Sequence, residues 1–206
     1  MRVYVENWDV WRASDVSGDA GQPLGTIPAS TRRRLNRYGR SAALLAADKV
    51  NEDPLVVFAS RYGDAERSVG ILHAIAGGDE ISPMQFSLSV HNAVCGILSI
   101  AWKLEEMQSV IAAGCDSFAM GITETLSLLN AYPKRDVLFL YVDHPLPDVF
   151  AAFNEPAMQA EACALLFSQT TKNDKAICLE MSVNDQYAKE DANLLEALEA
   201  VLIGTQ

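Results

Sequence analysis

Residues 86–104 read Phe86-Ser-Leu-Ser-Val-His-Asn-Ala-Val-Cys-Gly-Ile-Leu-Ser-Ile-Ala-Trp-Lys-Leu104. The pattern predicts a strand over Gln85–Val90 that turns sharply into a helix over Ala93–Met107. Apolar residues cover more than one face of this helix, which is typical of a helix buried at the centre of a fold. Enzymes can hold a nucleophile where a strand meets a helix, because the helix start favours a thiolate. The residue predicted at this turn, Ala93, has no nucleophile.

Predicted strands and helices alternate along most of the remaining chain. Strands are expected at 3–11, 55–60, 109–113 and 137–142, and helices at about 30–50, 64–75, 116–130 and 187–203. Residues 14–28 are expected to form a loop. Two more strands, 162–168 and 177–183, are expected to pair antiparallel across a polar turn. The alternation predicts an α/β fold with a central mixed, mainly parallel sheet and helices on both faces. With no repeat and no linker, residues 1–206 are expected to be one domain.

Composition and charge exclude several classes of function. The 206 residues are 50% hydrophobic and carry a net charge of −11, so the chain is globular and has no excess of basic residues to neutralise phosphates. This argues against nucleic acid or an anionic membrane surface as a partner. The N-terminus has no signal-like apolar core, and no apolar run reaches the roughly 18 residues of a membrane span. We therefore expect a soluble cytoplasmic protein.

The cysteines show no metal-binding or redox pattern. Cys95, Cys115, Cys163 and Cys178 form no C-x-x-C pair, and no histidine stands at zinc-ligand spacing. Each lies in a mostly apolar stretch, so we expect reduced thiols in or near the core. The sequence predicts neither a metal site nor a cofactor.

Five segments, taken together and in order, resemble a known family. They are Thr31-Arg-Arg-Arg-Leu-Asn-Arg-Tyr-Gly-Arg40, Phe58-Ala-Ser-Arg-Tyr-Gly-Asp64, Ser82-Pro-Met-Gln-Phe-Ser-Leu-Ser-Val-His-Asn-Ala93, Ala112-Ala-Gly-Cys-Asp-Ser-Phe-Ala-Met-Gly-Ile-Thr-Glu124 and Glu161-Ala-Cys-Ala-Leu-Leu-Phe-Ser168. The chain resembles the N-terminal half of a β-ketoacyl synthase of the thiolase superfamily, in particular the synthase-like proteins of bacterial aryl polyene clusters. The resemblance implies half of a thiolase-like fold.

The resemblance also bears on catalysis. In ketosynthases a strand runs through a small residue into the nucleophilic cysteine, and placing that pattern on residues 90–96 puts Ala93 at the nucleophile position. Cys95 lies roughly 200° further round the helix, which favours a packing role. If the pattern is shifted by two residues, Cys95 is the nucleophile instead.

The family's two catalytic histidines belong to its second half. The chain ends at about the point where that half would begin, and His73, His91 and His144 follow none of its motifs. We expect His73 on a helix surface and His144 in a loop. His91 either lines a shared pocket or hydrogen-bonds locally at the turn.

These points favour a non-catalytic, chain-length-factor-like subunit that pairs with a full-length ketosynthase and shapes its acyl tunnel. Ketosynthases dimerise through the strand before the nucleophile, so the resemblance implies an interface along this segment. Its expected residues are Gln85, Phe86, Ser87, Leu88, Ser89, Val90, His91 and Asn92. Two alternatives remain: a stand-alone module that binds an acyl carrier protein, and an acyl transferase or thioesterase that uses Cys95.

Five arginines stand close together on this acidic chain. Arg32, Arg33, Arg34, Arg37 and Arg40 leave 11 basic against 27 acidic residues elsewhere, a net charge of −16. The spacing of Arg33, Arg37 and Arg40 places them on one face of the predicted helix. Acyl carrier proteins are acidic, so this face could dock one by charge complementarity. The alternative is a solvated helix start that pairs with acidic residues of the same molecule.

Overall fold

Six strands form one mixed sheet within the part of the chain that the computed structural model describes, residues 1–12, 27–50, 52–154, 159–181 and 194–204. The strands are β1 (Arg2–Arg12), β2 (Leu55–Ala59), β3 (Gln108–Ile111), β4 (Val137–Asp143), β5 (Glu161–Ser168) and β6 (Ile177–Glu180), in the spatial order β3-β2-β4-β5-β1-β6. Strand β2 is parallel to β3 and β4, whereas β5 is antiparallel to β4 and β1, and β6 is antiparallel to β1. Strands β1 to β4 thus share one direction, which confirms the predicted mixed, mainly parallel sheet.

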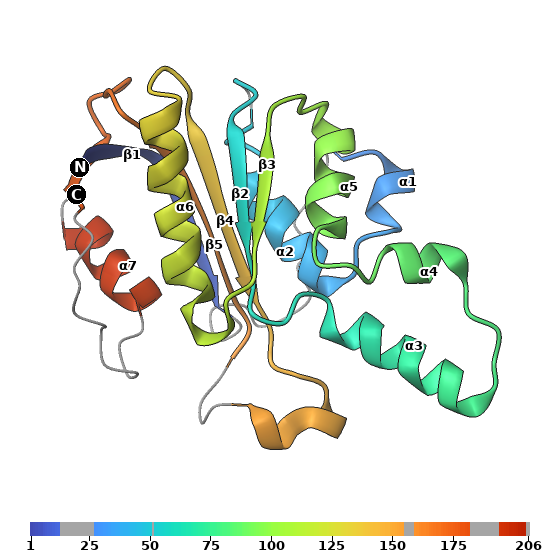
Figure 1. The fold of residues 1–206 in the computed structure, drawn as a ribbon. Helices are drawn as coiled ribbons and strands as arrows, with labels where there is room; N and C mark the ends of the chain where they lie inside the picture. Colours follow the sequence, from blue (N-terminus) through green and yellow to red (C-terminus); the bar gives the residue numbers. More distant parts are fainter. Residues whose placement is uncertain (13–26, 51, 155–158, 182–193, 205–206) are drawn as a thin grey trace.

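Helices cover both faces of the sheet, as expected (Figure 1). They are α1 (Ala29–Arg32), α2 (Arg37–Ala46), α3 (Ala65–Gly77), α4 (Pro83–Ser87), α5 (Ala93–Trp102), α6 (Ser117–Ala131) and α7 (Leu194–Gly204), with short 3₁₀ turns η2 (Gly114–Asp116) and η3 (Asp148–Phe153). Alternate strand residues point to opposite faces. Val57 and Ala59 of β2 therefore join α6 and α7 in one core, whereas Val56 and Phe58 join α2 and α5 in the other.

Helix α6 packs directly on β2 and β4. A Cβ atom added at Gly121 would lie 2.4 Å from a ring carbon of Phe139 on β4 and 2.9 Å from Cβ of Ala59 on β2. Only glycine lets α6 approach the strands this closely. The predicted helix 93–107 ends earlier, at Trp102. Its Val94, Ile97 and Leu98 are buried as predicted, but Ile100 is 75% exposed, so the helix is buried on one face and is not central.

The predicted strand Gln85–Val90 was also wrong, because α4 occupies residues 83–87. The Ser82 side chain accepts a hydrogen bond from the Gln85 amide at 3.4 Å, and Pro83 is the first helical residue. Both features favour a helix start. The apolar–polar alternation of Phe86–Val90 fits a strand, but α4 lies away from the sheet beside α3, with no strand next to it (Figure 1). Local capping therefore decides the conformation.

The predicted helix 30–50 is broken into α1 and α2. Asn36 caps α2 by accepting a hydrogen bond from the Gly39 amide at 3.3 Å. A cap residue has non-helical backbone angles, so the helix cannot run through it. Arg33 follows α1, whereas Arg37 and Arg40 belong to α2. The prediction that these three arginines share one helix face was wrong.

The predicted pairing of strands 162–168 and 177–183 was wrong as well, because β1 lies between β5 and β6. The connection 169–176 is not a tight turn. Glu6 of β1 accepts hydrogen bonds from the Lys172 amide at 2.9 Å and from the Asn173 side chain at 2.6 Å, which hold this connection against β1.

The remaining predicted elements are present within a few residues of their predicted bounds. Most of the predicted loop 14–28 and the first part of the predicted helix 187–203 lie outside the described residues. Among the described helices, none combines the length and apolar character needed to cross a membrane.

Candidate functional site

The parallel strands β2, β3 and β4 have their carboxyl ends on the same side of the sheet, at the bottom in Figure 1. Open α/β sheets bind ligands at the carboxyl ends of their strands, since the loops that follow the strands converge there. Here the converging segments are residues 60–64 after β2, 112–116 after β3 and His144 after β4. The carboxyl end of these strands is the candidate site.

A strand-to-helix turn with a cysteine lies between β3 and α6. Gly114 has a φ of +60°, which favours glycine, and Cys115 follows it with its side chain exposed. The Ser117 hydroxyl accepts a hydrogen bond from the Ala113 amide at 3.0 Å and donates one to the Gly114 carbonyl at 2.7 Å, closing the turn. Ala93 instead begins α5 after a turn that no strand precedes.

Sequence reasoning thus missed Cys115 as a candidate site residue. The signal was in the predicted elements, because strand 109–113, the residues Gly-Cys and helix 116–130 follow one another directly. The prediction of core or near-core thiols was wrong for Cys115 and Cys178, which are exposed, whereas Cys95 and Cys163 are buried.

Cys95 is in no position to act as a nucleophile in this structure. Its Sγ donates to Oε1 of Gln108 at 3.0 Å. Burial raises the pKa of the Cys95 thiol to about 12. The thiol is therefore protonated at neutral pH, and the thiolate is the nucleophilic form of cysteine.

His91 is held at the candidate site by the segment after β2. Its Nε2 lies 3.0 Å from the Ser60 carbonyl oxygen, and its ring packs so closely on Gly63 that a Cβ there would come within 2.9 Å. Gly63 also has a φ of +60°, and its amide donates to the Ser60 hydroxyl at 3.0 Å. Burial lowers the pKa of His91, so the imidazole favours its neutral form. Its buried Nδ1 has no hydrogen-bond partner among the described residues.

His144, expected as a loop residue, does follow β4 but is packed among aromatic rings. Its ring stacks on Trp11 at 6.3 Å between centroids and meets Tyr38 edge-on at 5.8 Å. Burial, helped by the nearby Arg37 charge, lowers the pKa of His144 to about 4, so it is neutral at neutral pH. Its Nε2 is buried without a hydrogen-bond partner in the described part of the chain.

Asp143 ends β4 beside His144. Burial raises the pKa of its carboxyl group to about 7, although the Arg61 amide donates to it at 3.3 Å and the Arg61 charge opposes the rise. The candidate site therefore holds the neutral imidazoles of His91 and His144 and the Asp143 carboxyl group, which titrates near neutrality. Within the described residues, no hydrogen bond or ring contact joins Cys115 to His91 or His144, so these residues do not form a nucleophile–base pair here.

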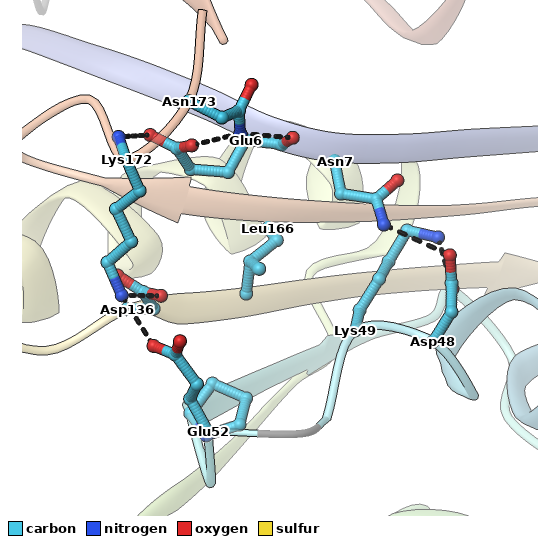
Figure 2. A pocket seen from close by; sticks show the side chains of 10 residues that line it. Glu6, Asn7, Asp48, Lys49, Glu52, Asp136, Leu166, Lys172 and Asn173 are labelled. Atoms are coloured by element: carbon cyan, nitrogen blue, oxygen red, sulfur yellow. Dashed lines mark hydrogen bonds and ion pairs between the residues drawn. The ribbon is translucent and has the colours of Figure 1, made fainter. Parts of the chain in front are cut away.

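A depression of about 280 Å³ lies at the opposite end of the strands, and most of the residues that line it are charged or polar (Figure 2). Its lysines are neutralised within the molecule. Figure 2 shows Lys172 directed at Glu52 and Asp136, each 2.7 Å from its Nζ. The buried Lys49 pairs with Asp9 and Asp48. These ion pairs connect strands and loops. Among the described residues, no cluster of three or more His, Cys, Asp or Glu side chains could hold a metal ion.

The comparison with known proteins decides the family. The model of the β-ketoacyl synthase N-terminal domain matches residues 8–202. The chain belongs to the β-ketoacyl synthase N-terminal domain family. None of the curated proteins with which the sequence was compared matches it.

Among solved structures, this β-ketoacyl synthase domain is similar to a chain of the ketosynthase ApeO in complex with its chain length factor ApeC from Xenorhabdus doucetiae. The two chains are 28% identical with a TM-score of 0.69, over 84% of this chain and 81% of that chain. The ishigamide ketosynthase/chain length factor is 14% identical in sequence with a TM-score of 0.63, over 84% of this chain and 64% of that chain. A β-ketoacyl synthase from Burkholderia phymatum is 16% identical in sequence with a TM-score of 0.58, over 82% of this chain and 59% of that chain. The expected resemblance and the thiolase-like fold are confirmed.

Proposed function

We propose that this β-ketoacyl synthase domain is a non-catalytic, chain-length-factor-like subunit. It pairs with a full-length ketosynthase in the cytoplasm and forms part of the wall of its acyl tunnel, in the synthesis of an aryl polyene or a related polyketide or fatty-acid-type product. The observation that carries this proposal is an open sheet edge among exposed apolar side chains. The similarity to a chain of a ketosynthase–chain length factor complex supports it.

Strand β3 forms one edge of the sheet, and β6 forms the other. Within the described residues β3 pairs only with β2, so the backbone groups on its other side are available to a strand of another chain. Its four residues carry no charge, and their side chains are half-buried. An uncharged open edge is a hazard for aggregation unless a partner covers it.

Exposed apolar side chains occur on the segments next to β3 in the sequence and on α6, which follows it. Met107 directly precedes β3, Ile100 lies on α5, and Met120 lies on α6. Phe86 and Val90, within the expected interface 85–92, are also exposed. The interface residues therefore remain part of the proposal although α4 replaces the predicted strand. In the revised proposal, strand pairing is assigned to β3, and 85–92 supplies apolar contacts.

Co-expression with a full-length ketosynthase from the same source tests the proposal. We expect the two chains to copurify as a stable complex, because pairing covers the β3 edge and the apolar surface around it. We also expect the ketosynthase alone to produce a different distribution of chain lengths. The proposal fails if no complex forms and the ketosynthase elongates equally well alone.

Cys115 favours a second candidate function, in which the chain itself carries an acyl group. Strand β3 leads through the small residues 112–114 to Cys115, and the thiol is exposed at the turn before α6. In such a step the sulfur attacks an acyl thioester and releases the donor thiol, so the acyl group moves from one sulfur to the other.

Alkylation with iodoacetamide, followed by peptide mass spectrometry, separates the two functions. For a non-catalytic subunit we expect Cys115 to react within about threefold of the rate of Cys178, because both thiols are exposed and a special nucleophile would react faster. Cys95 and Cys163 should stay protected in the folded protein. A Cys115 that reacts more than about tenfold faster than Cys178, or that alone becomes acylated by an acyl thioester, would instead establish the acyl-carrying function.

A further inference from the structure

Four charged residues lie in one row across the end of the sheet, next to the candidate site. Arg12 of β1 is opposite Glu161 of β5, and Glu161 is opposite Asp143 of β4. Arg61 follows β2, and its amide donates to the Asp143 carboxyl group at 3.3 Å. Directly opposite residues on antiparallel strands point to the same face, with Cβ atoms about 5 Å apart. Two carboxyl groups therefore lie side by side between two arginines.

The two carboxyl groups have different surroundings. Oε2 of Glu161 lies 3.9 Å from Nε of Arg12, whose charge balances it. Asp143 is only 4% exposed, and it accepts a hydrogen bond from the neutral Tyr141 hydroxyl at 3.4 Å. Burial raises the pKa of Asp143, and the Glu161 charge adds to the rise, whereas the Arg61 charge opposes it. Like charges directly opposite on neighbouring strands are destabilising, so Asp143 is the member of the pair that takes up a proton.

The other titratable groups around Asp143 keep one charge state near neutral pH. Burial raises the pKa of the Tyr141 phenol on β4 and of the Tyr38 phenol on α2, so both stay protonated. Burial lowers the pKa of His144, the next residue in the chain, to about 4, so it stays neutral. From α6, the uncharged Phe118 ring meets Tyr141 edge-on at 5.3 Å between centroids. Of these groups, Asp143 is the one that changes charge around neutral pH.

We infer that Asp143 and Glu161 form a carboxyl pair that shares one proton and holds the end of β4 to the start of β5 in a pH-dependent way. When Asp143 is protonated, its hydroxyl can donate to the Glu161 carboxylate across the strands. When water takes up that proton, two carboxylates face each other, and their repulsion loosens the end of β4. Residues 144–154, which include the exposed apolar Val149 and Phe153, follow directly from this end. One buried carboxyl group thus controls how firmly part of the candidate site is held.

Hydrogen–deuterium exchange of the full chain at pH 6 and pH 8, corrected for the intrinsic effect of pH on exchange, tests the inference. The pKa of Asp143 is raised from 3.8 to about 7 in the folded protein, so the folded form binds more protons and its stability falls as the pH rises through this range. We expect protection of the amides of residues 142–146 to fall about tenfold between pH 6 and pH 8. Asp143→Asn, which has no charge to lose, should show no such fall. The matched control Asp148→Asn removes an exposed carboxylate from the same stretch and should behave as the wild type does.

Infrared spectroscopy of the carboxyl groups supplies a second readout. The difference between the wild type and Asp143→Asn should show a protonated carboxyl band at pH 6 that is lost as the pH rises to 8. Glu161→Gln removes the neighbouring charge, so it should move the loss of this band to lower pH, and it covers the case in which Asp143→Asn folds poorly.

The same pH dependence of exchange in the wild type and Asp143→Asn, or an Asp143 that is fully ionised at pH 6, would overturn the inference. An unchanged midpoint in Glu161→Gln would also overturn it, because Glu161 would then not be the partner. These measurements use the single chain, whereas pairing with the ketosynthase is scored by copurification, so neither result decides the other.

Discussion

Replacing Phe86 with aspartate is expected to prevent this β-ketoacyl synthase domain from copurifying with a full-length ketosynthase. Phe86 is 61% exposed in the single chain, although an aromatic side chain of this size gains free energy when it is buried. In the proposed interface it is an aromatic anchor, and such residues carry much of the binding energy. A buried carboxylate in its place would lose the apolar contact and also cost desolvation. We expect the dissociation constant to rise by about 100-fold or more.

The matched control is Ile203→Asp on α7, which replaces an apolar side chain that is 57% exposed on the other face of the sheet. It adds the same charge to a surface to which the proposal assigns no partner, and the complex should survive. Both variants should unfold at nearly the wild-type temperature, because neither side chain belongs to the core. If Phe86→Asp copurifies as well as Ile203→Asp does, helix α4 is not part of the interface.

The second large effect is expected at Gly121, where α6 touches the sheet. Gly121→Ala should lower the free energy of unfolding by about 3 kcal/mol, because the new methyl group would overlap the Phe139 ring and crowd Ala59. Helix propensity alone predicts the opposite sign, a gain of about 1 kcal/mol. The sign of the change therefore reports directly on the close approach of α6 to β2 and β4. Urea unfolding followed by circular dichroism measures it.

Gly70→Ala on α3 is the matched control for this prediction. A Cβ at Gly70 meets nothing within 4 Å, so only the backbone effect remains, and we expect a gain of about 0.5–1 kcal/mol. The two substitutions have the same chemistry in the interior of two helices. If Gly121→Ala stabilises the protein as much as Gly70→Ala does, the close packing of α6 on β2 and β4 is wrong.

Elements with one strong local pattern were predictable from the sequence. The continuous apolar runs of β2 and β4 are buried on both faces. Helix α3 is capped by Asp64 before its first residue and by Gly78, which has a positive φ, after its last, as its sequence indicates. The Gln85–Val90 segment shows where this reasoning fails. Its alternation fits a strand, but a strand needs a neighbour that supplies hydrogen bonds, and the Ser82-Pro83 start satisfies the backbone locally as a helix. The predicted strand-to-helix turn at Ala93 was wrong for the same reason, because it depended on that strand.

By itself, the sequence determined the acidic charge, the family resemblance, the α/β class and the approximate positions of most strands and helices, because composition and hydrophobic periodicity are local properties. Only the tertiary structure decided that β1 lies between β5 and β6 and that β3 forms one edge of the sheet. It also brought Arg33 and Arg34 beside Arg67, which is distant in the sequence. Each of these depends on which segments pair across the chain, and strand pairing is set by the burial of two whole faces of the sheet, a property that no single segment contains.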